Sequence, residues 1–337
     1  MESLSYPWVT PVLGRLPSDA GALPRALLLA GRPGLGKRDC ALFLAQSLLC
    51  ETKRPALQPC GTCASCHLYQ AGNHPDLRVL EVGQDEEEGV SAAEEAEPGP
   101  AKKPSKQIAV QAVRALAELA TISAHRGGAK VICIIPAEAM HVSAANAVLK
   151  MLEEPPGNTF FLLVSHQPER LLPTIRSRCF HLTFGLPDNE PALLWLKGQG
   201  LEKANLALAQ AGYAPLGALE RARDEAFWQQ RARLLDTLVP GTFDPLHAAD
   251  CAESIEGPLV AELLAQWAYD VVALQSGGNV RYHLDYARSL HQAARVMPIH
   301  EIMRWYDTVI QFGRVARHPL NKRLAMESLL SGYPARR

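Results

Sequence analysis

The segment Gly31–Arg38 constrains the fold more than any other part of the sequence. It follows a continuous apolar run, Ala26–Ala30, which is typical of a buried strand. After it, apolar side chains recur between Ala41 and Leu49 at the spacing of an amphipathic helix. A strand, a turn of the pattern G-x-x-x-x-G-K and a helix form a loop whose backbone N–H groups and lysine surround phosphate. We therefore expect a phosphate loop at Gly31, Gly34, Gly36 and Lys37.

Two groups that a nucleotide-hydrolysing loop needs for magnesium are missing from the sequence. The residue after the loop lysine should be Ser or Thr, whose hydroxyl binds Mg²⁺, but it is Arg38. An acidic ligand is expected where the apolar run at 131–135 ends, and Ile135 and Pro136 stand there instead. Loss of this ion should slow phosphoryl transfer by many orders of magnitude, so we expect neither hydrolysis nor tight ATP binding.

Three alternatives for this loop stay open. Glu138, two residues beyond the expected position, could act as the acid of a working ATPase, although its position along the chain is unfavourable. Lys37 could retain a nucleotide that is not hydrolysed. Arg38 could instead fold over the loop and fill the phosphate position with its own charge.

The rest of the first half alternates between strand and helix patterns. Apolar runs typical of buried parallel strands occur at 77–80, 130–135 and 160–164. The segment 107–123 carries apolar residues at helical spacing. Strands that alternate with helices, after an initial phosphate loop, predict a parallel α/β domain covering residues 1–182.

Two regions depart from this alternation. The segment 83–106 is rich in acidic residues and has few apolar side chains, so it predicts a flexible surface insertion. After Pro187 the strand patterns stop, and apolar residues recur at helical spacing. We expect a small helical domain at 183–225 and a helical bundle at 226–337.

Charge and hydropathy exclude some classes of function. The net charge of −1 gives the chain no general attraction for nucleic acid, so any DNA contact needs a local patch or a partner. No apolar run approaches the roughly 18 residues that a membrane span needs. Residues 1–5 lack the charged and apolar regions of a secretory signal, so we expect a cytoplasmic protein whose cysteines are thiols or metal ligands.

Four cysteines lie close together in the sequence, and two C-x-x-C units overlap among them. Tetrahedral Zn²⁺ binds four thiolates, and C-x-x-C turns place two sulfur atoms on one side of the ion. The sequence therefore predicts a structural zinc site in the segment 50–67, with the ligands Cys50, Cys60, Cys63 and Cys66. His67 could replace one ligand, and a redox-active C-x-x-C pair is an alternative. The lack of a basic stripe beside the cysteines argues against a zinc-dependent DNA-binding module.

Several strings of the sequence together resemble bacterial clamp-loader subunits of the AAA+ class. The most specific are Leu-Glu-Glu-Pro-Pro at Leu152–Pro156 and Ser-Arg-Cys at Ser177–Cys179. The segments Asn146–Lys150 and Tyr6–Trp8, together with the four cysteines, extend the resemblance over nearly the full length. Among these subunits, the chain is similar to the delta-prime type of DNA polymerase III. The gamma/tau motor subunits differ because they carry an intact G-x-x-x-x-G-K-[ST] and an Asp-Glu pair.

The resemblance implies a role in DNA replication. It implies a stator subunit without ATPase activity, in a complex with gamma/tau and delta subunits that loads the sliding clamp onto primed DNA. The domains at 183–225 and 226–337 would be the helical lid and the oligomerising collar of an AAA+ subunit. Enzyme activity would belong to the holoenzyme, a DNA-directed DNA polymerase and hence a nucleotidyltransferase. Arg126 and Lys130 are candidate DNA contacts.

By the same resemblance, Arg178 is expected to reach the ATP site of a neighbouring subunit as an arginine finger. A planar, permanently charged donor suits the charge that develops on the γ-phosphate. The alternative is that Arg176 and Arg178 are ordinary surface residues. Two positions depart from the motor subunits: Ser165-His166 stands where a Thr pair is frequent, and residues 212–219 contain no arginine. Both departures favour a subunit that supplies an arginine and does not use its own site.

Overall fold

The computed structural model describes residues 6–52, 57–82, 107–108, 110–121, 124–126, 128–316 and 321–335. The insertion predicted at 83–106 lies outside these residues. The chain forms two compact units, Met1–Trp195 and Leu196–Arg337. Within the described parts of the chain, no helix combines the length and the apolar character needed to cross a membrane.

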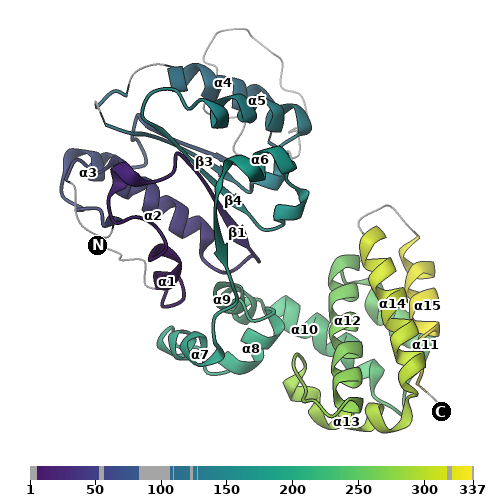
Figure 1. The fold of residues 1–337 in the computed structure, drawn as a ribbon. Helices are drawn as coiled ribbons and strands as arrows, with labels where there is room; N and C mark the ends of the chain where they lie inside the picture. The colour runs from purple at the N-terminus through teal and green to yellow at the C-terminus, as the bar shows by residue number, and fades with distance from the viewer. Residues whose placement is uncertain are drawn as a thin grey trace, which may run out of the picture. The chain divides into compact units, whose positions relative to one another are not determined.

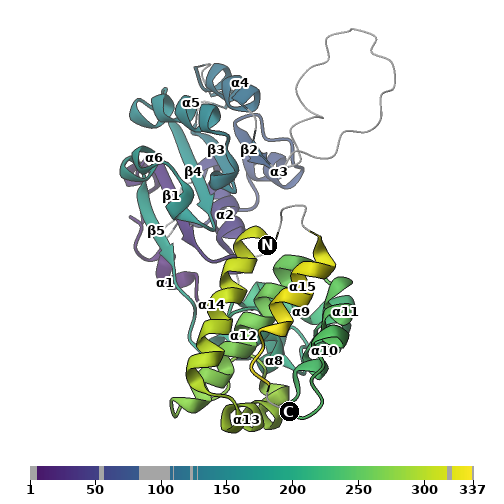
Figure 2. The same ribbon diagram turned by 90° about the vertical axis from the view of Figure 1, so that its right-hand side faces the viewer.

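The first unit is built on a five-stranded parallel sheet with the strand order β2-β3-β4-β1-β5; Figure 1 labels the three central strands and Figure 2 labels all five. The central strands β3, β4 and β1 are buried almost throughout, which explains their continuous apolar runs. This arrangement confirms the predicted parallel α/β fold. The strands are β1 (Ala26–Gly31), β2 (Leu77–Glu81), β3 (Lys130–Ile135), β4 (Thr159–Ser165) and β5 (Phe180–Phe184).

The sequence pattern did not predict β5. This strand lies at the edge of the sheet, where it pairs with β1 in register Leu27↔Phe180. Only Leu182 and Phe184 of its five residues are buried, because the other side chains face solvent. An edge strand of this length therefore lacks the continuous apolar run that marks the central strands.

Helices cover the sheet on two sides (Figures 1 and 2). On one side, α2 (Lys37–Leu49) contacts β1, β3 and β4, α3 (Ala64–Gln70) contacts α2, and α1 (Thr10–Leu13) contacts β5. On the other side lie α4 (Val110–Thr121), α5 (Val142–Glu153) and α6 (Pro173–Arg178). Their buried residues share one apolar core with the sheet. The helix predicted at 107–123 corresponds to α4. Short 3-10 turns, η1 (Ala20–Ala22), η3 (Ala137–Ala139) and η4 (Pro168–Arg170), connect these elements.

The second unit is helical, which confirms the predicted change from strands to helices. The longest of its helices, α12, contacts α13 and α14, and its Trp267 is fully buried. The Trp267 indole N–H donates to the Tyr333 hydroxyl at 2.9 Å. Following α7 (Asn189–Gly198), the helices are α8 (Ala204–Gln210), α9 (Pro215–Arg223), α10 (Glu225–Leu235), α11 (Pro245–Glu253), α12 (Gly257–Gln275), α13 (Ala287–Val296), α14 (Ile299–Val315) and α15 (Lys322–Ser331), with 3-10 turns η5 (Asp236–Leu238) and η6 (Leu284–Tyr286).

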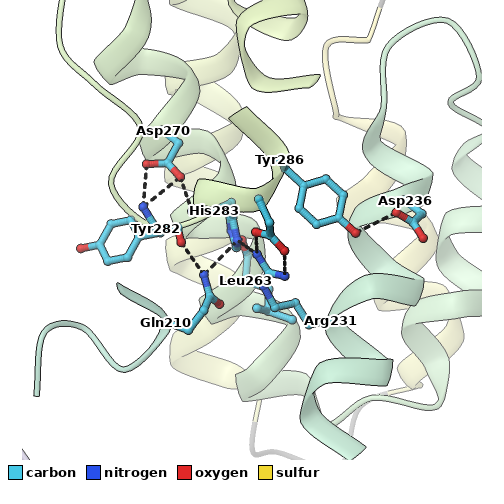
Figure 3. Close-up of polar contacts among 9 residues, drawn as sticks. Gln210, Arg231, Asp236, Leu263, Asp270, Tyr282, His283 and Tyr286 are labelled. Atoms are coloured by element: carbon cyan, nitrogen blue, oxygen red, sulfur yellow. Dashed lines mark hydrogen bonds and ion pairs between the residues drawn. The ribbon is translucent and has the colours of Figure 1, made fainter. Parts of the chain in front are cut away.

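A buried polar network fixes the loop that precedes α13 (Figure 3). Asp270 on α12 accepts hydrogen bonds from the backbone N–H groups of residues 281–283 at 2.7 to 3.1 Å. Nδ1 of His283 lies 3.1 Å from Gln210 Nε2 and 3.0 Å from Arg231 Nη2. Because both of these partners are donors, the imidazole is neutral and carries its proton on Nε2.

Arg231 extends the network to the surface. Its guanidinium donates to both carboxylate oxygens of Asp285, at 2.8 and 2.6 Å. Gln210 belongs to α8 and Arg231 to α10, so the hydrogen bonds to His283 join segments on either side of residues 225 and 226. The domain boundary expected there stays a prediction.

Candidate functional site

The phosphate-loop segment joins the carboxyl end of β1 to the start of α2. Gly36 precedes α2 with a φ of 80°, in the left-handed region that favours glycine. At Gly31 a Cβ atom would lie 2.4 Å from the Phe184 carbonyl oxygen, so a side chain would not fit between β1 and β5. β1 lies between β4 and β5. The chain continues from β1 to β2 at one edge of the sheet and from the neighbouring β4 to β5 at the other edge, so the connections diverge between β1 and β4. In parallel sheets, ligands bind beyond the carboxyl ends of the strands at such a point.

Lys37 begins α2 and is 2% exposed. Its Nζ donates to the Arg32 carbonyl oxygen inside the loop. Burial lowers the pKa of Lys37 to about 8, and the negative charge of Glu138 opposes this shift in part. The lysine therefore lies within the loop, where it can supply positive charge to a phosphate.

Arg38 points away from the loop. Its Nε lies 2.7 Å from Glu81 Oε1 and its Nη2 lies 3.2 Å from Glu81 Oε2. Glu81 ends β2, and β3 and β4 separate that strand from β1. The hydrogen bond with Glu81 raises the pKa of the guanidinium, which stays charged. The alternative in which Arg38 folds over the phosphate loop is therefore wrong for this structure.

Polar groups that follow β3 and β4 approach Lys37. Glu138 lies in η3, and its Oε1 accepts the backbone N–H of His166 at 2.9 Å. Burial lowers the pKa of His166, and the nearby charge of Lys37 lowers it further. Among the described residues, Glu138 Oε2, Ser165 Oγ and His166 Nδ1 are buried without a hydrogen-bond partner. Because buried polar atoms are normally paired, these three atoms mark a place for a water molecule or a ligand.

Aromatic side chains cover the start of α2, a feature that sequence reasoning missed. The Tyr6 and Trp8 rings stack at 5.5 Å, and the Trp195 ring packs edge-on against both. The Trp8 indole N–H donates to the Leu35 carbonyl oxygen in the loop at 3.1 Å, and the Tyr6 hydroxyl donates to Asp39 at 2.7 Å. The Tyr6–Trp8 string therefore supports the loop conformation.

The structure brings the four predicted metal ligands together. The sulfur atoms of Cys50, Cys60, Cys63 and Cys66 all lie within 4.8 Å of one another. The Cys50–Cys63 and Cys60–Cys66 sulfur pairs are each 3.9 Å apart. A tetrahedral zinc site with Zn–S bonds of about 2.3 Å has sulfur atoms about 3.8 Å apart, so the cluster fits this ion.

Backbone N–H groups also favour thiolates in this cluster. The N–H groups of Thr62 and Cys63 point at the Cys60 sulfur, at 3.4 and 3.2 Å. The hydrogen bond from Thr62 is the largest cause of a Cys60 pKa lowered to about 5, whereas burial raises the pKa of Cys66 to about 12. The four residues could hold a metal ion; His67 is not one of the converging groups.

Arg178 ends α6 and pairs with Glu153 at the end of α5. Its Nη1 also donates to the Thr174 carbonyl oxygen at 3.0 Å. The side chain of Arg178 is 35% exposed and that of Glu153 is 49% exposed, so solvent reaches the pair. This ion pair joins the Leu-Glu-Glu-Pro-Pro and Ser-Arg-Cys strings, a connection that the sequence alone did not reveal.

Comparisons with known proteins identify the family. A sequence profile described as DNA polymerase III, delta subunit, matches residues 17–187, more than half of the chain. The DNA polymerase III subunit delta′ of Pseudomonas aeruginosa is 38% identical over 278 residues, which cover 80% of this chain and 78% of that protein. The chain belongs to the DNA polymerase III delta′ family. The delta′ subunit of Escherichia coli K12 is 34% identical over 237 residues, which cover 69% of this chain and 65% of that protein.

A comparison with solved structures also gave a match over nearly the whole chain. A DNA polymerase III gamma subunit-related protein from Thermotoga maritima matches with a TM-score of 0.45 and 16% identity, over 97% of this chain and 98% of that protein. Membership of the delta′ family follows from the sequence matches.

The two candidate DNA contacts of this delta′ family member lie at the amino ends of the strands. Arg126 Nη2 lies 2.8 Å from Glu51 Oε1, and Lys130 begins β3. Arg126 lines a cavity of about 340 Å³ with His74 and Asp76. The phosphate loop lies at the opposite, carboxyl ends of the strands, so these residues and the loop belong to separate surfaces of the first unit.

Proposed function

We propose that this chain is a stator subunit of a DNA polymerase III clamp loader that does not hydrolyse ATP itself. It acts with gamma/tau and delta subunits in the cytoplasm to load the sliding clamp onto primed DNA. One observation carries the proposal. The residue that should bind Mg²⁺ in the loop is an arginine, and this arginine forms an ion pair with Glu81. A guanidinium repels a metal cation, so the loop lacks a group that phosphoryl transfer requires.

In this proposal Arg178 acts at the ATP site of a neighbouring motor subunit. Its guanidinium would exchange Glu153 for the γ-phosphate, where charge develops during hydrolysis. The exposure of the ion pair supports this exchange, because partly exposed pairs contribute little to stability. The helical second unit is then the part that assembles with the other subunits.

The four cysteines have a structural role in the proposal. A closed set of four thiolates leaves no coordination position for substrate, so a zinc ion there would fix the segment between α2 and α3. The backbone N–H groups around Cys60 would hold the thiolates in place for the ion.

The test uses the assembled complex, with all motor sites inactivated except the one beside this subunit. Arg178→Ala should lower DNA-stimulated ATP turnover at that site by about 10³-fold or more, the range for loss of an arginine finger. Arg178→Lys should restore little, because an ammonium lacks the planar fork. Arg170→Ala, an exposed arginine before α6, is the control. Unchanged turnover in an intact Arg178→Ala complex would exclude the proposed role.

A second candidate function is an ATPase in which Glu138 supplies the missing acid. The proximity of Glu138 to Lys37, seen in the effect of its charge on the lysine pKa, favours this candidate. It requires turnover of Mg-ATP by the purified chain alone, and loss of that turnover in both Lys37→Ala and Glu138→Gln. Absence of turnover by the purified chain excludes it.

A further inference from the structure

We propose that Glu81 is a positioning residue that holds Arg38 out of the phosphate loop, and that the loop binds polyphosphates in their metal-free form. Arg38 stands directly after Lys37, in the first turn of α2. Its two contacts with Glu81, at 2.7 and 3.2 Å, hold the guanidinium near the carboxyl end of β2, the outermost strand on that side of the sheet. This inference rests on the part of the proposed function in which the loop does not use magnesium.

The Arg38–Glu81 ion pair can exchange its partner. The side chain of Arg38 is 52% exposed, whereas that of Glu81 is 17% exposed. Solvent therefore reaches the guanidinium more than the carboxylate, which leaves the arginine more room to change partner. A phosphate bound next to Lys37 carries more charge than one carboxylate and accepts the same bidentate hydrogen bonds. Glu81 and a bound phosphate therefore compete for the same arginine.

The preferred ligand follows from the charge at the position of Arg38. In an intact loop the Ser or Thr hydroxyl binds Mg²⁺, which then neutralises the phosphates. Here a permanent positive charge takes that place, close to the charge of Lys37. A second cation between them is repelled, so pyrophosphate or ATP without magnesium should bind better than the magnesium complex.

The experiment measures pyrophosphate and ATP binding to the purified full-length chain by calorimetry. The buffer is freed of divalent cations on a resin, without a soluble chelator, so that the cysteine cluster keeps any metal. Glu81→Gln should bind pyrophosphate about 2- to 5-fold more tightly than the unmodified chain, the range for release of an arginine from a partly exposed ion pair. Excess Mg²⁺ should weaken binding in both proteins.

Three further variants separate this explanation from a general change in charge. Arg38→Met should bind no more tightly than the unmodified chain, and Arg38→Met combined with Glu81→Gln should lose the gain. Glu169→Gln removes an exposed negative charge in η4 and should change nothing. The proposal is overturned if Glu81→Gln gives no gain, if the gain survives without Arg38, if Mg²⁺ strengthens binding, or if no variant binds. None of these outcomes depends on Arg178, so the proposed function and this inference can fail separately.

Discussion

The two members of the Arg231–Asp285 ion pair differ in exposure, and this difference predicts unequal effects when either one is removed (Figure 3). The side chain of Arg231 is 2% exposed, whereas that of Asp285 is 38% exposed. Asp285→Ala would leave a buried guanidinium without its carboxylate. Arg231→Met would leave a carboxylate that water can reach, with an apolar side chain in the buried space.

The magnitudes follow from these environments. Removing one partner of a buried pair costs about 3–5 kcal/mol, and the partial exposure of Asp285 places Asp285→Ala near 3 kcal/mol. Arg231→Met loses a hydrogen bond to His283, but Gln210 still donates to the same nitrogen, so we expect a cost of about 1–2 kcal/mol. The double variant should resemble Arg231→Met alone, because no buried charge then needs a partner. The second substitution is thus expected to stabilise the Asp285→Ala protein.

The assay is unfolding of the full-length chain in urea, followed by far-ultraviolet circular dichroism. Urea is preferred to guanidinium because it does not screen the ion pair. Arg233→Met, an exposed arginine on the same helix, is the matched control and should change stability by less than about 0.5 kcal/mol. Equal losses for the two single variants, or a double variant no more stable than Asp285→Ala, would refute the reasoning.

Two other predictions concern pH and metal. Burial lowers the pKa of His283 to about 3, so the unfolded chain binds more protons below its ordinary value of 6.5. The free energy of unfolding of the second unit should therefore fall by about 1.4 kcal/mol per pH unit as the pH decreases from about 6.5 to about 5. In urea unfolding, His283→Gln should not show this fall in stability. The same fall in the His283→Gln variant would contradict the prediction. For the cysteine cluster, the chain purified without chelators should contain about one zinc ion, and Cys63→Ser should lower both this content and the unfolding midpoint of the first unit. Elemental analysis measures the metal, and a zinc-free chain with intact thiols would exclude the site.

The sequence predicted those features that depend on neighbouring residues. The phosphate loop, the central strands and the four converging cysteines each lie in short segments whose patterns carry the information. β5 was missed because an edge strand needs only two buried side chains. The polar network of the second unit was missed because its members, Gln210, Arg231 and His283, come from separate helices and loops.

The ion-pair partners of Arg38 and Arg178 could not be predicted for the same reason. Arg38 pairs with a residue 43 positions away in the chain. Arg178, at the end of α6, pairs with a residue at the end of α5, the preceding α-helix. No local pattern selects one glutamate among many as the partner of a given arginine. The ion-pair partner of each arginine depends on how strands and helices are arranged in the folded unit, and the sequence does not give the strand order of the sheet.

A common principle connects the two arginines. Arg38 takes the place of a magnesium ligand, Arg178 is the proposed donor to a neighbour, and both guanidinium groups are reached by solvent and pair with glutamates. An unpaired guanidinium beside other positive charges would be repelled, whereas a weak exposed pair holds it at little cost until phosphate is present. In the proposed function, a chain without a magnesium ligand in its loop can in this way keep charged groups available to phosphate. In the two proposals, the ion pairs with Glu81 and Glu153 determine when each arginine becomes available to phosphate, and Glu81→Gln and Arg178→Ala test the two cases independently.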